Sequence, residues 1–220
     1  MTEQTANVLG ATGLVGSALT RQLLADDRFS KVRVFVRRST GRASPKLEEV
    51  IVDYEQMEDW GKQLQGDVLF SCLGTTLKTA GSQEAQYRVD YTYQYQAAEM
   101  ASRQGIKRYV LISSVGADPK SGFFYSRMKG ELDEAVQQLP FAHLHILRPG
   151  VLEGDRKEDR LGESIGIWLG HRLKWIPGLR AYRPIHADTV ATAMIQAATR
   201  PANEQIQISS LEEVFQLAGE

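Results

Sequence analysis

Short apolar runs alternate with longer stretches of helical period along most of the chain. The runs are rich in Val, Ile and Leu, as in strands that are covered on both faces, and they predict strands at 6–9, 32–37, 50–53, 68–73, 109–112, 143–147 and 205–208. Between them, apolar residues at helical spacing predict helices at about 14–26, 56–65, 84–104, 123–138, 187–199 and 210–217. This alternation is typical of βαβ units. It predicts the α/β class, with a doubly wound parallel sheet of about seven strands and helices on both faces.

The stretch from Gly150 to Pro184 departs from this rhythm because glycine and proline recur along it. We expect it to leave the sheet and form a small carboxy-terminal lid. No linker sets it apart, so we interpret residues 1–220 as a single domain with a lid or substrate segment at about 150–184. The charged side chains between Ile165 and Ala187 are all basic and alternate with aromatic residues. This composition is typical of a lid whose cations stay in water; a surface for an acidic lipid or protein partner is the alternative.

Composition and charge narrow the function only by exclusion. The chain has 220 residues, of which 42% are hydrophobic and 24% charged, as in ordinary globular proteins. Its 26 basic and 27 acidic residues leave a net charge of −1, which provides no overall field for nucleic acid. We therefore expect no nucleic-acid partner, and any anion-binding site must be local.

The single cysteine, Cys72, excludes an internal disulfide and a cysteine-based metal cluster, and it suits a reducing compartment. His143 and His145 alternate along a predicted strand without a further ligand at metal-binding spacing, so no metal site is expected. The amino terminus shows no signal-peptide pattern, and no run of about 18 apolar residues occurs. We therefore expect a cytoplasmic protein without a transmembrane segment.

Three glycines stand between the first predicted strand and the first predicted helix, in Gly10-Ala-Thr-Gly13-Leu-Val-Gly16. At such a turn, backbone N–H groups and the positive end of the helix dipole meet an incoming phosphate. The first glycine allows the tight turn, the second lets phosphate approach, and the third lets helix pack on strand. The motif predicts a Rossmann-like dinucleotide site, with a ligand-free turn as the alternative. Its predicted contacts are Gly10, Thr12, Gly13, Leu14, Val15 and Gly16.

The second predicted strand ends in Arg37-Arg38-Ser39-Thr40, where an NAD-binding domain typically has an acid that holds the ribose 2′-hydroxyl. Two guanidiniums and two hydroxyls suit the 2′-phosphate of NADP instead. We therefore predict that Arg37 and Arg38 bind NADP(H) in preference to NAD(H); a solvated basic turn is the alternative. Asp53, after the third predicted strand, either contacts the adenine edge or caps a turn.

Ser113 and Ser114 follow the fifth predicted strand, and Tyr125 and Lys129 stand four residues apart on the next predicted helix. Residues at this spacing share one helix face. A tyrosine hydroxyl is a poor acid or base at neutral pH until a nearby cation favours its phenolate, and Lys129 supplies that cation. A serine at the strand end is placed to hold a substrate oxygen. The set predicts proton transfer beside the dinucleotide.

With these motifs, the chain resembles the atypical, compact short-chain dehydrogenases/reductases, specifically the branch of the Tat-interacting oxidoreductase-like proteins. The resemblance rests on Gly10 to Gly16, Cys72-Leu-Gly-Thr-Thr76, Ala80-Gly81, Leu111 to Asp118, Tyr125 to Glu131, Leu147 to Leu152 and Gly154-Asp155-Arg156. It implies that Tyr125 donates a proton to a carbonyl and that Lys129 binds the nicotinamide ribose. Ser114 is its active serine, with Ser113 as the second choice. It also implies NADPH contacts from Arg37, Arg38, Cys72, Leu73, Gly74, Ser113, Pro149 and Val151.

The chain departs from typical members at Val89-Asp90, where they have an asparagine. The resemblance implies an oxidoreductase that reduces a small carbonyl substrate. A regulatory NADPH-binding protein with a protein partner is the alternative, and an epimerase or dehydratase is the second alternative. Tyr87, Tyr91 and Tyr95 recur every four residues, which predicts either the seam of a homodimer or packing against the sheet.

Overall fold

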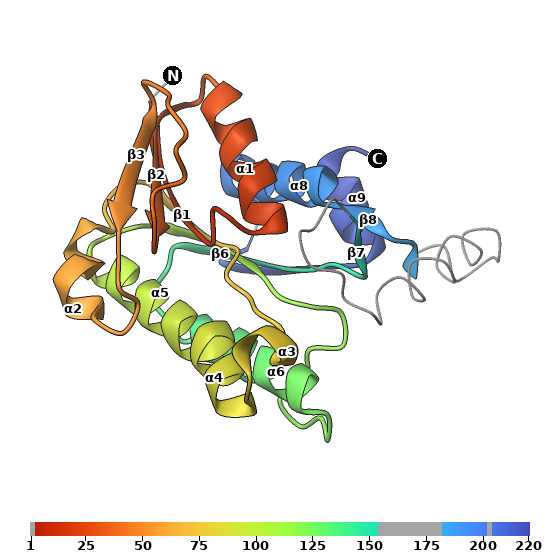
Figure 1. Ribbon diagram of the computed structural model, residues 1–220. Coiled ribbons are helices and arrows are strands. Elements are labelled where there is room, and N and C mark those ends of the chain that lie inside the picture. The colour runs from red at the N-terminus through yellow and green to blue at the C-terminus, as the bar shows by residue number, and fades with distance from the viewer. Residues whose placement is uncertain (1–2, 154–181, 202–203) are drawn as a thin grey trace.

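The fold is built on one seven-stranded sheet in which all neighbouring strands are parallel (Figure 1). The computed structural model describes residues 3–153, 182–201 and 204–220. The strand order is β3-β2-β1-β4-β5-β6-β9, so the chain first builds outward from β1 and then from β4 in the opposite direction. This confirms the predicted doubly wound sheet. The strands are β1 (Gln4–Leu9), β2 (Phe29–Val36), β3 (Leu47–Ile51), β4 (Val68–Ser71), β5 (Arg108–Ile112), β6 (His143–Arg148) and β9 (Ile206–Ser210).

Two layers of helices cover the sheet, one on each face (Figure 1). The first layer contains α1 (Leu14–Ala25), α8 (Ala187–Thr199) and α9 (Glu212–Ala218). The second layer contains α2 (Met57–Trp60), the 3-10 turn η1 (Gly61–Gln63), α3 (Leu77–Ala80), α4 (Gln83–Tyr87), the π-helical turn η2 (Arg88–Thr92), α5 (Tyr93–Arg103) and α6 (Phe124–Gln137).

Each strand divides its side chains between two cores because successive residues point to opposite faces. In β4, Val68 and Phe70 belong to the core under α1 and α8, whereas Leu69 belongs to the core under α5 and α6. All four residues of β4 are buried. A central strand that is covered on both faces therefore reads as a continuous apolar run, which is the pattern that predicts it.

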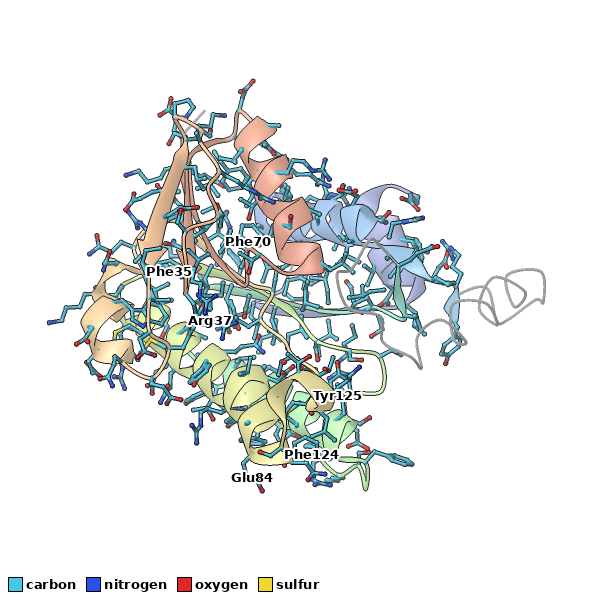
Figure 2. The ribbon with its side chains drawn as sticks, viewed as in Figure 1. Phe35, Arg37, Phe70, Glu84, Phe124 and Tyr125 are labelled. Atoms are coloured by element: carbon cyan, nitrogen blue, oxygen red, sulfur yellow. The ribbon has the colours of Figure 1, made fainter. Side chains whose placement is uncertain are left out.

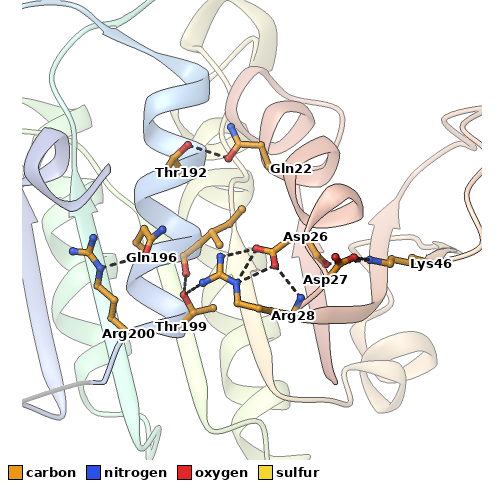
Figure 3. A network of polar contacts seen from close by, with 10 residues as sticks. Gln22, Asp26, Asp27, Arg28, Lys46, Thr192, Gln196, Thr199 and Arg200 are labelled. Carbon is orange, nitrogen blue, oxygen red and sulfur yellow. Dashed lines mark hydrogen bonds and ion pairs between the residues drawn. The ribbon is translucent and has the colours of Figure 1, made fainter. Parts of the chain in front are cut away.

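Hydrogen bonds between polar side chains hold α1 and its end against α8. The two helices lie side by side although they are far apart in the sequence (Figure 3). Thr192 Oγ1 donates to Gln22 Oε1 at 3.1 Å, and Arg28 Nη1 donates to Thr199 Oγ1 at 2.9 Å. Arg28 also pairs with Asp26 at 2.6 Å, and its hydrogen bonds hold the pKa of the Asp26 carboxyl below the usual range. Helix α8 is thereby held against the helix that follows the glycine turn.

Two predicted helices are interrupted in the structure. The helix predicted at 84–104 consists of α4, η2 and α5, and the π turn in its middle is a feature that often marks functional sites. The helix predicted at 56–65 is α2 followed by η1. Gly61 packs there so closely on α5 that an added Cβ would lie 2.7 Å from Met100 Cγ.

The predicted excursion from the sheet is described only at its two ends. There, β7 (Leu152–Glu153) and β8 (Ile185–His186) pair in parallel and bring the ends together. The lid predicted at 150–184 and its aromatic, cationic stretch fall mainly on residues 154–181, which lie outside the described residues. The lid and the single-domain interpretation of 1–220 stay predictions.

We expect Phe70→Ala to destabilise the protein because Phe70, labelled in Figure 2, is fully buried in the central strand β4. Loss of a buried phenylalanine side chain costs about 3–5 kcal/mol. Phe123 is 81% exposed, so Phe123→Ala removes the same atoms from the surface and serves as the matched control, with a change below about 0.5 kcal/mol. Urea unfolding measures both. Equal unfolding midpoints would contradict the placement of Phe70 in the core.

Candidate functional site

The loops that follow the strands meet along one edge of the sheet. Because the strands are parallel, their carboxyl ends share that edge, and the strand order reverses there between β1 and β4. The loops begin at Gly10 after β1, Arg37 after β2, Cys72 after β4, Ser113 after β5 and Pro149 after β6. Figure 2 shows Arg37 at the end of β2, with Tyr125 near the start of α6. The topology therefore gathers the predicted site loops.

The glycine turn after β1 is tightly packed on two sides. Gly10 has a φ of +76°, and an added Cβ would lie 2.5 Å from the Cys72 carbonyl oxygen. A Cβ on Gly16 would lie 2.1 Å from the Gly10 carbonyl oxygen. The fold itself therefore requires both glycines. Gly13 is exposed to solvent, and a Cβ there would lie 3.3 Å from Gly10 O, a tight contact that needs only a small shift.

Helix α1 begins at this turn without a side chain that caps it. Its N-cap residue is Gly13, no side chain accepts a hydrogen bond there, and the first turn has no acidic residue. The short helices α3 and α4 are capped by the hydroxyls of Thr76 and Ser82. The first-turn N–H groups of α1 are therefore available to an anion. Among the predicted contacts, Thr12 is exposed, whereas the Val15 side chain belongs to the core.

The basic turn after β2 exposes two guanidiniums. Within the described part of the chain, neither Arg37 nor Arg38 has an acidic partner. The hydroxyls of Ser39 and Thr40 both donate to the Glu49 carboxylate, that of Ser39 at 2.6 Å. These bonds hold the pKa of Glu49 below its usual range. The two hydroxyls are thus engaged with the protein, which narrows the predicted phosphate contact to the arginines.

Asp53 caps a turn. Its Oδ1 accepts the N–H of Glu55 at 3.0 Å, and its carbonyl oxygen accepts the indole N–H of Trp60 at 2.8 Å. The contact with adenine stays a prediction.

Cys72 is partly buried, with its sulfur 3.7 Å from that of Met194, and burial raises the pKa of its thiol. The thiol is therefore protonated at neutral pH and is a poor nucleophile.

The two serines after β5 differ in accessibility. Ser113 is 5% exposed, and its N–H donates to Leu147 O at 2.8 Å, which extends the pairing of β5 with β6. Ser114 is half-buried, and its hydroxyl donates to Val115 O at 3.2 Å. The N–H of Val115 donates to Pro149 O at 3.0 Å, so the serine loop and the Pro149 loop are held together. Ser114, the first choice, has the more accessible hydroxyl.

Helix α6 presents Tyr125 and Lys129 on one face, as their spacing predicts. Lys129 Nζ lies 6.0 Å from the centroid of the Tyr125 ring. Tyr125 is 41% exposed but Lys129 only 3%, so solvent reaches the tyrosine and not the ammonium. Gly130 allows the chain after β5 to approach this helix, because an added Cβ would lie 2.2 Å from Pro119 N. The serine loop is thereby packed beside Lys129.

Asp90 reaches Lys129 from the π turn η2, a contact that sequence reasoning missed. Its Oδ1 lies 3.0 Å from Lys129 Nζ, and both side chains are buried. Burial alone would lower the pKa of Lys129, but nearby groups, with Asp90 first, outweigh it and raise that pKa above its usual value. Lys129 is therefore charged at neutral pH. The acid at position 90, in place of the usual asparagine, is the only sequence signal for this pair.

A second buried ion pair, also missed, lies one helical turn beyond Lys129. Arg148 Nε and Nη2 each lie 2.8 Å from Asp133 Oδ2, and the Asp133 side chain is 1% exposed. Burial raises the pKa of Asp133, although the Ser113 hydroxyl and Arg148 act in the opposite direction. Asp133 belongs to no motif, and Arg148 lies in the Leu147 to Leu152 stretch without a predicted role, so only the spacing of Asp133, four residues after Lys129, gave any hint.

The three tyrosines of α4, η2 and α5 stack in a row. The ring centroids of Tyr87 and Tyr91 lie 4.7 Å apart, and those of Tyr91 and Tyr95 lie 6.1 Å apart. Tyr91 and Tyr95 pack against the core, which agrees with the predicted packing against the sheet. The homodimer seam stays a prediction. A hollow of about 630 Å³ is lined by Tyr87, Tyr91, Glu131, Glu134, Ala135, Gln137 and Gln138.

Metal-binding side chains do not gather anywhere in the described residues. These residues contain no group of three or more His, Cys, Asp or Glu that could hold a metal. His145 instead shares a hydrogen bond of 2.8 Å with Ser209 Oγ, and burial lowers its pKa. No helix in the described ranges has the length and apolar character needed to span a bilayer.

Comparison with known proteins identifies the family. The sequence model of a family described as NAD(P)H-binding matches residues 10–201. The chain belongs to this NAD(P)H-binding family. Protein HTATIP2 of Rattus norvegicus is 35% identical over 218 residues, which cover 94% of this chain and 86% of that protein. Protein fmp52, mitochondrial, of Emericella nidulans is 34% identical over 224 residues, covering 97% and 96%. The resemblance to the Tat-interacting branch of the short-chain dehydrogenases/reductases is confirmed.

Solved structures show the same fold in nucleotide-sugar proteins. MoeE5 in complex with UDP-glucose and NAD has a TM-score of 0.70 at 16% identity, covering 98% of this chain and 81% of that chain. A UDP-N-acetylglucosamine 4-epimerase of Methanobrevibacter ruminantium has a TM-score of 0.67 at 15% identity, covering 98% and 81%. At such identities the likeness shows the Rossmann-like fold alone.

The expected cytoplasmic location is wrong. Relatives from Emericella nidulans, Aspergillus niger and Candida albicans, 34% to 35% identical to this chain, are named mitochondrial. The expectation rested largely on the single Cys72. An unpaired thiol fits any reducing compartment, so it cannot distinguish the cytoplasm from a reducing compartment inside an organelle.

The glycine turn of this NAD(P)H-binding protein fits a pyrophosphate. The uncapped first turn of α1 offers N–H groups, and Gly13 before it is exposed to solvent. We expect Gly13→Ala to lose little stability, because its Cβ needs only a small shift of Gly10 O, but to weaken NADPH binding about tenfold or more, because the methyl group and this shift disturb the close approach of phosphate to the backbone.

Gly16→Ala is the matched control for this effect. Its methyl group would meet backbone, so we expect it to lower the free energy of unfolding by about 1–3 kcal/mol even without cofactor. Urea unfolding and titration of NADPH fluorescence separate the two effects. NADPH affinity in Gly13→Ala equal to that of the parent would contradict the phosphate position.

Proposed function

We propose that the protein is an NADP(H)-dependent oxidoreductase that reduces a carbonyl group in a small substrate, with Tyr125 as the proton donor. The observation that carries the proposal is the pair on α6. An accessible tyrosine lies against a buried ammonium, 6.0 Å from ring centroid to Nζ, in a member of an NAD(P)H-binding family. The charged Lys129 stabilises the negative charge that develops on Tyr125 Oη as its proton leaves.

Reduced nicotinamide, when bound, supplies the hydride that the carbonyl carbon accepts. Tyr125 Oη transfers its proton to the carbonyl oxygen, so the C=O group becomes an alcohol and a phenolate remains on the protein. The Lys129 ammonium stabilises this phenolate. Ser114 turns its hydroxyl hydrogen from Val115 O to the carbonyl oxygen of the substrate and orients it. Because Tyr125 is 41% exposed, water can return the proton.

The cofactor preference rests on the basic turn after β2. A 2′-phosphate needs cations that are not already neutralised, and among the described residues neither Arg37 nor Arg38 has an acidic partner. The nearby Glu49 carboxylate, which would repel a phosphate, is held by the hydroxyls of Ser39 and Thr40. We therefore propose that the arginines carry the preference for NADP(H) over NAD(H).

Tyr125→Phe should lower turnover about a hundredfold to ten-thousandfold, because the variant has no hydroxyl proton to give. Its NADPH affinity should stay at the parent level. Consumption of NADPH with a panel of carbonyl compounds measures turnover, and fluorescence titration measures NADPH affinity. Tyr95→Phe, which removes a hydroxyl from α5, is the matched control and should behave as the parent.

Two outcomes count against this assignment. A Tyr125→Phe variant as active as the parent would exclude Tyr125 as the donor. A parent that binds NADPH but reduces none of the carbonyls would favour the alternative function, in which cofactor occupancy regulates binding to another protein without turnover.

Replacing both arginines, Arg37→Ala with Arg38→Ala, should weaken NADPH binding about tenfold or more and leave NADH binding unchanged. The reason is that each charge-assisted hydrogen bond contributes about 1.5–3 kcal/mol, and only NADPH has the 2′-phosphate. Arg200→Ala, an arginine at the end of α8 (Figure 3), is the control. Competitive titration with both nucleotides is the measurement. Equal losses for NADH and NADPH would show that the arginines contact a part that the two cofactors share.

A further inference from the structure

We infer that Asp90 is a positioning residue that keeps the Lys129 ammonium charged and fixed beside Tyr125, and that ties this ammonium to the cofactor loop after β4. The inference rests on the proposed function and adds a residue to it. Asp90 enters the site from η2, whereas Lys129 and Tyr125 both stand on α6.

The two carboxylate oxygens of Asp90 have different partners. Oδ1 lies 3.0 Å from Lys129 Nζ, and Oδ2 accepts the backbone N–H of Thr75 at 2.8 Å. Thr75 follows Gly74, where an added Cβ would lie 3.4 Å from Asp90 Oδ1. Leu73 and Gly74 belong to the predicted cofactor loop. One side chain thus joins this loop to the catalytic helix α6.

The backbone of Asp90 is held as firmly as its side chain. In the π turn its carbonyl oxygen accepts a hydrogen bond from Gln94 Nε2 at 2.7 Å. Gln94 Oε1 in turn accepts the hydroxyl of Ser71, the last residue of β4, at 2.7 Å. Both Asp90 and Gln94 are buried. The carboxylate therefore has little freedom to leave Lys129.

Lys129 needs this partner because it is buried. Its ammonium faces Asp90 from η2 and both Tyr125 and Asp133 from its own helix, and Asp133 is paired with Arg148 from β6. Burial favours the neutral amine, and Asp90 is the only carboxylate of the described residues in direct contact with Nζ. Without Asp90, the free energy of the charged form rises, and Lys129 loses its proton at a lower pH.

The effect on stability has a definite sign. The pKa of Lys129 is raised in the folded protein, so the pair stabilises the parent below the pKa of an unfolded lysine. That contribution is lost as the pH rises through the folded-state pKa. In Asp90→Asn the pKa of Lys129 falls below its unfolded value. The buried charge therefore destabilises the variant at neutral pH and destabilises it less at alkaline pH. The stability gap between parent and variant should therefore narrow as the pH rises.

The first test is urea unfolding of Asp90→Asn without cofactor between about pH 6 and pH 10. The lower limit lies about four units below the usual lysine pKa, and the upper limit lies near it. Asparagine keeps the size of the side chain and removes only its charge. The midpoint should fall by about 1 M urea at pH 7, and the gap to the parent should shrink at alkaline pH. Glu99→Gln, which removes an exposed carboxylate paired with Arg103 on α5, is the control and should show no such gap. A gap that is constant with pH would overturn the inference.

The double variant Asp90→Asn with Lys129→Met covers the case in which the single variant does not fold. Removing both charges leaves no unpaired ion in the core, so the double variant should be more stable than Asp90→Asn and should lack its pH dependence. A double variant no more stable than the single one would overturn the inference, because Asp90 would then be needed for its hydrogen bond to Thr75 alone.

The second test is the pH profile of turnover. In Asp90→Asn, kcat should fall about tenfold or more with a smaller change in KM, and its alkaline limb should move to lower pH as Lys129 loses its charge. An unchanged profile would contradict the role beside Tyr125. If the parent reduces no carbonyl but the pH-dependent stability gap is present, the proposed reaction fails while the tie between Asp90 and Lys129 stands.

Discussion

Parallel pairing of the strands is the constraint on which the rest of the structure depends. A parallel strand cannot return by a hairpin, so every connection crosses a face of the sheet and every strand ends at the same edge. Both faces are then filled by helices and apolar side chains, and the edge is the place left for polar chemistry. The two halves meet where Gly10, in a left-handed conformation, lies against the Cys72 carbonyl. The loops after β1 and β4, both predicted to bind cofactor, are neighbours for that reason.

Charge burial is the second constraint, and it explains residues for which no motif predicts a role. A cation beside Tyr125 is useful only if it keeps its proton, and burial opposes that. The structure places Lys129 among two buried carboxylates, Asp90 and Asp133, and pairs the second of these with Arg148. Two acids and two bases thus balance within one cluster. The net charge of −1 for the whole chain gives no indication of this local arrangement.

The sequence was sufficient for features that depend on local spacing. The central strands are apolar because both faces are covered, the glycine turn has a steric requirement at each end, and Tyr125 and Lys129 share a helix face. Contacts between distant segments could not be predicted from it: Asp90 meets Lys129 because the fold packs η2 against α6. The hydroxyls of Ser39 and Thr40 were likewise assigned to phosphate, since nothing local indicated that β3 brings Glu49 to them. The compartment was wrong because one thiol carries too little information.

Under the proposed function, the partners of Asp90 also determine where the proton comes from. Its carboxylate bonds Lys129 and the Thr75 N–H, and its carbonyl bonds Gln94, so each of these oxygens already has a partner within the protein. Tyr125, by contrast, is open to solvent. The proton that leaves Tyr125 is therefore replaced from the exposed side of the ring. Lys129 then acts on Tyr125 through its fixed charge, which is why the group that fixes that charge matters as much as the lysine itself.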